Sequence, residues 1–327
     1  MFIRFFKNNN PSSFILLPLF ALALRIGGFF SEHVFAAKYN MPLYEILTKP
    51  FNSFHFTNAF SAFILTVGEA FLLNYVVNKN EILTKPSFLP ALFFIVFMSC
   101  DSSLFTLHPL LLASLFLLLA INKSANSYQK DAAFSNAFDA GVLLSLSALF
   151  YFPSIVFLPL LGIGFIMFRP FNWREWVISF IGLMLPYIFV FTYYFWNDKL
   201  GNWWDVKMFF SGLQEQSQTI HSKSFYFMIA VCLLIILLSF GKLFTGLAEA
   251  SQKNQKGILL LVWFSVFGLV SVFVTPEISI LSFSPLAIPA SVFCANYFLK
   301  IKKGWWGELL FILLLFSIFI NHLSHYF

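Results

Sequence analysis

Long apolar runs separated by short polar segments dominate the chain. About 20 consecutive apolar residues cross a bilayer as a helix, which pairs its own backbone groups where there is no water. Eleven runs approach or reach this length, at residues 14–30, 57–77, 87–99, 104–121, 138–151, 153–168, 175–196, 224–244, 257–275, 278–299 and 307–324. The pattern predicts an all-α, polytopic transmembrane bundle of about eleven helices, forming one domain over residues 1–327.

The positions of the basic residues give this bundle an orientation. Cytoplasmic loops of membrane proteins carry an excess of Lys and Arg. With the N-terminus inside, fourteen of the twenty basic residues fall on the cytoplasmic side and six on the outer side, namely Arg25, Lys38, Lys49, Lys199, Lys207 and Lys223. An odd number of helices then predicts that the C-terminus lies outside. The formal charge of +6 is explained mainly by this orientation signal and not by a nucleic-acid partner.

Several helices are expected to be too short to cross the membrane fully. The runs 87–99 and 138–151 fall well below 20 residues, and SCDSS (99–103) interrupts the chain after the first of them. Non-helical backbone at membrane depth is tolerated where protein buries it or where it lines water. We therefore expect SCDSS to line an outward-facing cavity. Two longer outer segments, about 31–56 and 197–223, flank this region, and the second has the pattern of an amphipathic interfacial helix.

Composition agrees with a membrane protein and limits the chemistry. The chain is 59% hydrophobic and 10% charged, whereas soluble domains carry about 25% charged residues. The three cysteines, Cys100, Cys232 and Cys294, are far apart and lack CxxC spacing, so we expect buried thiols and neither a disulfide framework nor a metal site. Motifs for nucleotide binding, zinc proteolysis and serine hydrolysis are absent, and we predict no cofactor.

The stretch LALRIGGFFSEHV (22–34) holds the clearest candidate chemistry. Arg25 lies near the outer end of the first helix, where it either extends to the lipid headgroups or faces the cavity and binds a phosphate or pairs with Glu32. Glu32 is a candidate general base, and His33 follows it directly. His108 and Asp101 join the list because SCDSS places them close to the same cavity. Arg25 is thus the candidate substrate-binding residue, and the other four are candidate catalytic residues.

Glu69 is a further polar residue, inside the second apolar run. A carboxylate in a membrane is costly and usually faces the protein interior. We expect Glu69 to make a buried structural contact with a polar group, such as Asn74 or a residue on another helix.

The layout resembles the polytopic glycosyltransferases of the GT-C class. The matching features are ALALRIGGFFSE (21–32), the short pair of runs over 87–121, and DAGVLLSLSALFYFPSIVFLPLLGIGFIMF (139–168). Where those enzymes carry a paired acidic motif after the first helix, this chain has the single carboxylate of Glu32. The resemblance implies transfer of a sugar from a polyprenyl-phosphate donor in the outward cavity, with Glu32 as base and Arg25 holding the phosphate.

At finer grain, RPFNWREWVISFIGLMLPYIFVF (169–191) resembles a family of uncharacterised multi-pass inner-membrane proteins from Bacteroidota, some of them labelled carotene oxygenase. That resemblance implies location in a bacterial inner (cytoplasmic) membrane and contact with membrane lipids, and it brings no established activity. The alternative to a transferase is therefore a non-catalytic membrane protein, acting as an assembly factor or as a carrier of lipids or small molecules.

Overall fold

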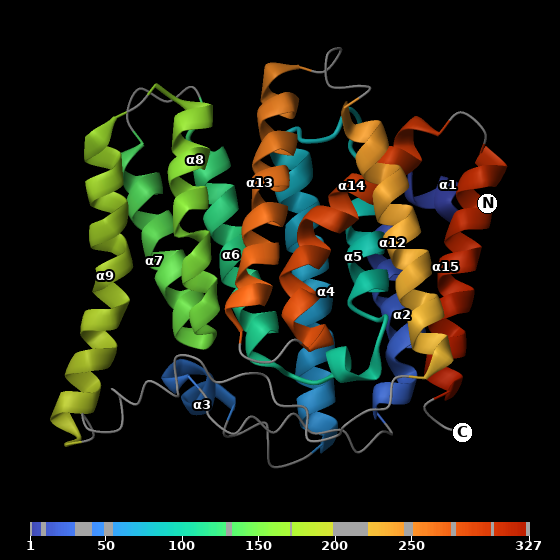
Figure 1. Cartoon of the computed structure of the whole chain (residues 1–327), viewed down its shortest axis with the longest axis horizontal. Helices are drawn as coiled ribbons and strands as arrows, with labels where there is room; N and C mark the ends of the chain where they lie inside the picture. The colour runs from blue at the N-terminus through green and yellow to red at the C-terminus, as the bar shows by residue number, and fades with distance from the viewer. Residues whose placement is uncertain are drawn as a thin grey trace.

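A computed structural model describes residues 2–7, 11–29, 41–48, 55–128, 133–170, 172–198, 222–244, 251–275, 279–301 and 304–324. These residues form an all-α helical bundle (Figure 1). Its α-helices are α1 (Phe2–Phe6), α2 (Ser13–Arg25), α3 (Pro42–Thr48), α4 (His55–Lys79), α5 (Leu89–Phe97), α6 (Pro109–Ala125), α7 (Phe134–Phe150), α8 (Leu158–Phe168), α9 (Trp173–Trp196), α12 (Lys223–Phe244), α13 (Gln252–Val274), α14 (Ala287–Lys300) and α15 (Gly304–Ser324).

Each of the eleven apolar runs corresponds to a helix of this bundle. Six helical segments among the described residues are long and apolar enough to cross a membrane, and four shorter apolar segments of 10–17 residues accompany them. The remaining run, 87–99, is α5, which has only nine residues. The prediction of a polytopic bundle of about eleven apolar helices is therefore confirmed, and so is the shortness of the run before SCDSS.

The most apolar short helix forms the centre of the bundle. All nine residues of α5, LPALFFIVF, are buried, because a helix without a polar face must be surrounded by other helices. Helices α4 and α14 pack against it. At one edge of the molecule α9 packs against α7, and at the other edge lie α2 and α15 (Figure 1).

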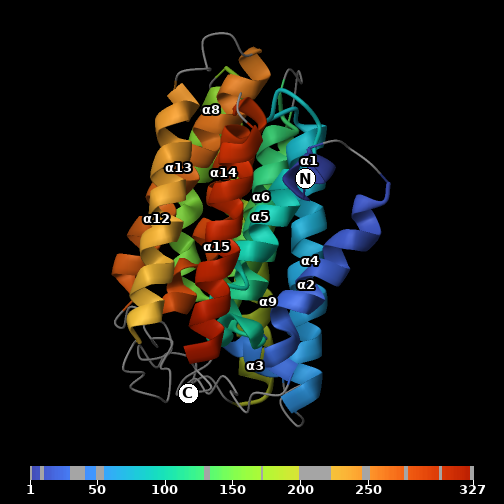
Figure 2. The same ribbon diagram turned by 90° about the vertical axis from the view of Figure 1, so that its right-hand side faces the viewer.

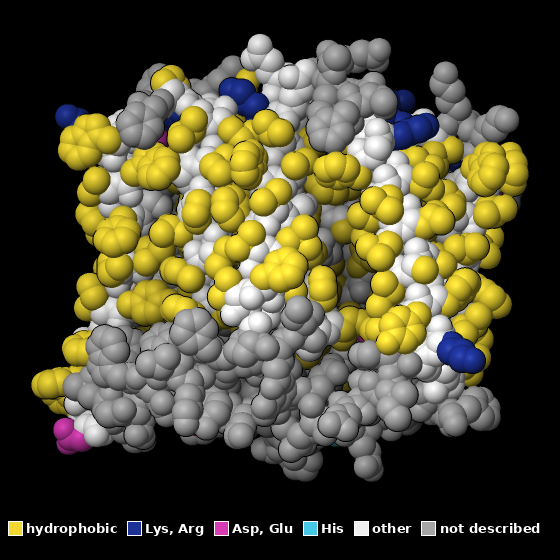
Figure 3. All heavy atoms as spheres, in the orientation of Figure 1, with side chains coloured by type: hydrophobic (Ala, Val, Ile, Leu, Met, Phe, Trp, Pro, Cys, Tyr) yellow, Lys and Arg dark blue, Asp and Glu magenta, His cyan; other side chains and the backbone are white. Residues whose placement is uncertain are grey.

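Two ends of the bundle can be distinguished. The first helix, α1, and the end of α15 lie at opposite ends, as an odd number of crossings requires (Figures 1 and 2). Among the described residues, most Lys and Arg side chains visible in Figure 3 lie along the upper rim, the end that holds α1. We call this the basic end and the opposite one the far end. That the basic end faces the cytoplasm stays a prediction.

Three 3₁₀ segments join helices at the far end. They are η2 (Ser102–Phe105) between α5 and α6, η3 (Phe152–Phe157) between α7 and α8, and η4 (Ile280–Leu286) between α13 and α14. Segments η2 and η4 contact each other, and η3 contacts α13. Helix α3 also lies at this end (Figures 1 and 2). The breaks near residues 99–103 and 151–153 are thus buried among neighbouring elements.

Two expectations differ from the structure. Helix α7 begins at Phe134 and has 17 residues. The predicted run, 138–151, therefore began too late and made the helix too short. The four residues that the prediction left out, 134–137, include Ser135 and Asn136, and such polar side chains interrupt a hydropathy pattern. The segment 31–56 also contains a helix, α3, that was not predicted. The predicted amphipathic helix over 197–223 lies almost entirely outside the described residues.

Candidate functional site

The break between α5 and α6 leaves backbone carbonyl groups without helical partners in the interior of the bundle. The last carbonyls of a helix lack partners within it, and in hydrocarbon no water can replace them. Side chains from distant helices fill this role. His322 Nε2 lies 2.9 Å from the Ser99 carbonyl oxygen, and Asn321 Nδ2 donates to the Cys100 carbonyl oxygen across 3.1 Å. The segment 98–108, which we call the corner, is therefore held by α15.

Arg25 is the main organiser of the corner. Its Nη2 donates to the carbonyl oxygens of Met98 (2.9 Å) and Leu104 (2.7 Å), on either side of the break. Its Nη1 donates to the Thr66 hydroxyl of α4 across 2.8 Å and lies 3.4 Å from the Ala62 carbonyl oxygen. The side chain is 2% exposed. Arg25 thus points into the protein and connects α2, α4 and the corner.

The local sequence around Arg25 permits this close approach. The 3₁₀ helix η1 (Ile26–Phe29) follows α2, and Gly28 packs so tightly on the Phe105 ring that a Cβ atom at that position would overlap it. The Arg25 guanidinium lies 5.1 Å from the centre of the same ring, within the range of a cation–π contact. Four hydrogen bonds and an aromatic face explain why an apolar run contains an arginine.

Asp101 and His108 are capping residues in this structure. Asp101 Oδ1 accepts hydrogen bonds from the backbone N–H of Ser103 (3.0 Å) and from its hydroxyl (2.8 Å), which fixes the start of η2. His108 Nδ1 accepts from the Leu111 N–H across 3.2 Å and caps α6. Because Nδ1 accepts, the ring hydrogen of the neutral form is on Nε2. His108 is fully buried.

The corner brings together three of the predicted site residues. Arg25 donates to the carbonyl oxygens of Met98 and Leu104, which precede and follow Asp101 in the chain. His108 ends the same segment. Glu32 and His33 lie outside the described residues, so their roles stay predictions. The roles assigned to Arg25, Asp101 and His108 in catalysis or phosphate binding also stay predictions, although each of these side chains is engaged by the protein itself.

Other polar residues complete the corner and were not singled out from the sequence. Both backbone groups of Leu107 are hydrogen-bonded, since its N–H donates to Asn58 Oδ1 of α4 (2.8 Å) and its carbonyl accepts from the Tyr44 hydroxyl of α3 (2.7 Å). The sequence alone could have singled out Asn58, Thr66 and Asn321, because a polar side chain within an apolar helix is costly and usually has a partner. Their partners were not predictable, because they lie up to 221 residues away.

Glu69 makes the buried contact that its sequence position predicted. It is 1% exposed, and its Oε1 accepts from the Ser114 hydroxyl of α6 across 2.8 Å. The partner lies on another helix, so the expectation of a structural polar contact between helices is confirmed.

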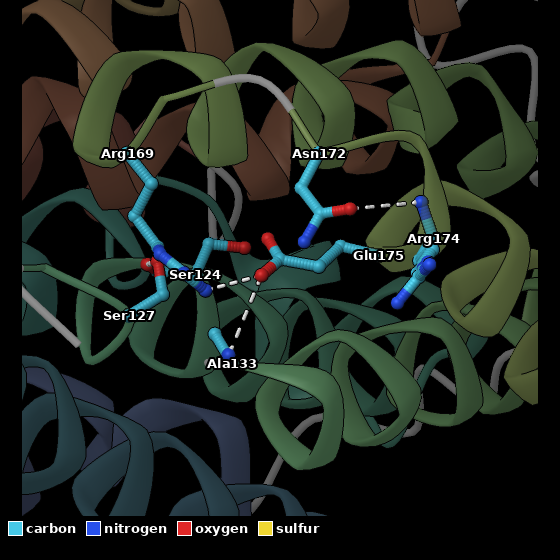
Figure 4. Close-up of polar contacts among 7 residues, drawn as sticks. All are labelled: Ser124, Ser127, Ala133, Arg169, Asn172, Arg174 and Glu175. Carbon is cyan, nitrogen blue, oxygen red and sulfur yellow. Dashed lines mark hydrogen bonds and ion pairs between the residues drawn. The ribbon is translucent and has the colours of Figure 1, made fainter. Parts of the chain in front are cut away.

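A buried ion pair stabilises the basic end (Figure 4). Arg169, which follows α8, pairs with Glu175 in the first turn of α9, and their side chains are 7% and 2% exposed. Glu175 also accepts from the backbone N–H of Ala133, at the start of α7, across 3.4 Å. Glu175 therefore connects the beginnings of α7 and α9 to the end of α8.

A small pocket lies at this basic end and not at the corner. Asn80, Phe168 and Lys253 are among the residues that line it, and it has room for about one water molecule. The expected outward cavity therefore stays a prediction.

Comparison with known proteins identifies the family of this chain. No curated protein and no solved structure matches the chain. One family model matches residues 40–327, and its description is a family of unknown function, DUF6427. The prediction of an uncharacterised family of multi-pass helical proteins is confirmed in this coarser form. Because the match covers most of the sequence, the chain belongs to the DUF6427 family.

Proposed function

We propose that this multi-pass membrane protein performs no catalysis of its own and acts as an assembly factor that holds a transmembrane helix of a partner protein. The observation that carries this proposal is the state of Arg25, the candidate substrate-binding residue. Four protein acceptors occupy its terminal nitrogens, and two of them are carbonyl groups that would otherwise be unpaired in the membrane. A structural role accounts for every one of these contacts.

Helix α9 is the surface that fits a partner best. Only 22% of its apolar span is buried within the protein, compared with 44% for α4 and for α13. Its contact with α7 is very close, because a Cβ atom on Gly141 or Gly182 would overlap the backbone of the other helix. The remaining faces carry large side chains such as Phe189 (67% exposed) and Trp196 (85% exposed). Close packing between transmembrane helices supplies most of their association energy.

Photocrosslinking in living cells tests this assignment. We expect a benzoyl-phenylalanine placed at Phe189 to form an adduct with a defined membrane protein, because a partner helix covers that face. The matched control is Phe273 of α13, an equally apolar position that is 77% exposed, where we expect lipid adducts alone. Mass spectrometry of the adducts distinguishes the two. Lipid adducts alone at both positions would rule out α9 as the docking surface.

A second candidate function is transfer of a sugar from a polyprenyl phosphate in a bacterial inner membrane. It is favoured by the placement of three 3₁₀ segments at the same end of the bundle, the predicted outer end. They are η2, which is part of the corner, and η3 and η4. In this function Glu32 removes the proton from an acceptor hydroxyl and Arg25 stabilises the departing phosphate. His33, His108 and Asp101 assist. Arg25 would have to release the carbonyls of Met98 and Leu104 first.

Replacement of Glu32 by glutamine separates the two candidate functions. Glutamine keeps the size and hydrogen-bonding capacity of the side chain but is not basic. A transferase should therefore lose about 10²–10⁴-fold in rate. Under the assembly-factor proposal, we expect Glu32→Gln to complement a deletion strain fully, and glycolipid profiles of that strain to show no accumulated polyprenyl-phosphate sugar. Failed complementation by a normally inserted Glu32→Gln protein, with accumulated donor in the deletion strain, would favour the transferase.

A further inference from the structure

The three cysteines lie on segments that meet around α12. Cys100 follows α5, Cys232 is in α12 and Cys294 is in α14. The sulfur atoms of Cys100 and Cys232 are 3.9 Å apart, although 132 residues separate them in the chain. Cys294 is engaged differently, since its sulfur accepts a hydrogen bond from the Ser239 hydroxyl of α12 across 3.5 Å. The sequence predicted buried thiols without a disulfide framework, and the structure shows that two of the thiols are in contact.

The two paired thiols differ in accessibility. Cys100 is buried, whereas Cys232 is partly exposed. Cys100 belongs to the corner, and the hydrogen bond of its carbonyl oxygen from Asn321 fixes its backbone. A disulfide has a sulfur–sulfur distance of about 2.05 Å. Bond formation therefore requires the two sulfur atoms to move from 3.9 Å apart to about 2.05 Å. Rotation of the two side chains can begin this approach.

We propose that Cys100 and Cys232 form a reversible intramolecular disulfide when a peroxide reaches the far half of the bundle. Peroxide is small and uncharged, so it enters the apolar region that excludes large oxidants. It transfers one oxygen to the Cys232 sulfur, giving a sulfenic acid and releasing one water molecule. The Cys100 sulfur then attacks the Cys232 sulfur, the S–S bond forms and a second water leaves with the thiol proton. Two thiols are oxidised by two electrons, and one peroxide is reduced to two waters. A dithiol reductant reverses the step by exchange.

The disulfide would connect the corner to α12. Bonds of this kind stabilise a fold mainly by restricting the unfolded chain, and more so for long loops. Oxidation is therefore expected to raise the midpoint temperature of unfolding. The corner backbone, held by Arg25 and α15 in the reduced protein, would then also be held by a covalent link.

Thiol counting on the full-length protein in lipid nanodiscs tests the proposal. After treatment with hydrogen peroxide and removal of the excess, the protein is denatured and labelled with a maleimide polymer that adds a visible mass for each free thiol. We expect three labels on the reduced protein and one on the oxidised protein. Peptide mapping should join the peptides of Cys100 and Cys232, and dithiothreitol should restore all three labels.

Serine variants assign the bond. Cys294→Ser is the matched control, and we expect it still to lose two thiols on oxidation. Cys232→Ser should keep both remaining thiols. Cys100→Ser should lose only the Cys232 label, because the sulfenic acid formed there has no second thiol to attack it, and no S–S bond should be mapped. Retention of three labels by the folded wild-type protein at peroxide concentrations that oxidise an exposed cysteine would overturn the proposal. A mapped bond from Cys232 to Cys294, or dimers linked between chains, would overturn it equally. These outcomes rest on the wild-type protein and do not depend on whether a variant folds.

Discussion

Replacement of Arg25 by alanine is expected to lower the free energy of unfolding by about 3–5 kcal/mol. The substitution leaves the carbonyl oxygens of Met98 and Leu104 buried without their donor. Each unpaired buried polar group costs about 1–3 kcal/mol, and the lost volume and cation–π contact add to this. Unfolding by titration with a denaturing detergent, followed by circular dichroism, measures the change.

Two comparisons make the Arg25 result specific. Arg4→Ala is the matched control, because Arg4 is exposed on α1 and should change stability by less than about 0.5 kcal/mol. Arg25→Lys should be intermediate, since a single ammonium cannot span the acceptors that the planar guanidinium reaches. If Arg25→Ala unfolded with the same midpoint as Arg4→Ala, the side chain would not hold the corner.

Glu175→Ala is the second substitution with a large expected effect. It removes the partner of Arg169 in a buried pair and the acceptor of the Ala133 N–H. Breaking a buried pair by removing one member costs about 3–5 kcal/mol, because the other charge stays buried and uncompensated. The same detergent titration measures the loss. We expect it to weaken the attachment of α9 at the basic end.

An exposed ion pair nearby supplies the control for Glu175. Asp139 pairs with Lys123, and their side chains are 36% and 38% exposed, so Asp139→Ala should cost less than about 1 kcal/mol. The double variant Arg169→Ala with Glu175→Ala should lower the free energy of unfolding by less than the sum of the two single variants. Each single variant leaves one buried charge unpaired, whereas the double variant leaves none. Equal losses for Glu175→Ala and Asp139→Ala would contradict a special role for the buried pair.

The architecture was predictable because hydropathy is a local property. Each apolar run corresponded to a helix, and the nine-residue α5 was recognisable from the polar residues of SCDSS that end it. The start of α7 and the whole of α3 were missed, because both depend on contacts across the chain. The backbone N–H of Ala133, at the start of α7, donates to Glu175 of α9, and the Tyr44 hydroxyl of α3 donates to the Leu107 carbonyl oxygen.

The candidate site was predictable only in part, for the same reason. Arg25 was recognised as unusual and was assigned to phosphate binding, and its local neighbours Glu32 and His33 were assigned to catalysis. Its observed partners include carbonyl groups 73 and 79 residues away. No pattern in the sequence indicates which helix will break next to a given arginine. Likewise, the spacing of Cys100 and Cys232 gives no sign that their sulfurs are in contact.

An experimental density map of the protein in nanodiscs made from its native lipids tests the central claim most directly. The claim is that Arg25 is bound to the protein and not to a substrate phosphate. We predict density for the Arg25 guanidinium within hydrogen-bonding distance of the Met98 and Leu104 carbonyl oxygens, with no lipid density at its terminal nitrogens. A lipid phosphate within hydrogen-bonding distance of those nitrogens, with the two carbonyl contacts broken, would contradict the assembly-factor account and favour the transferase.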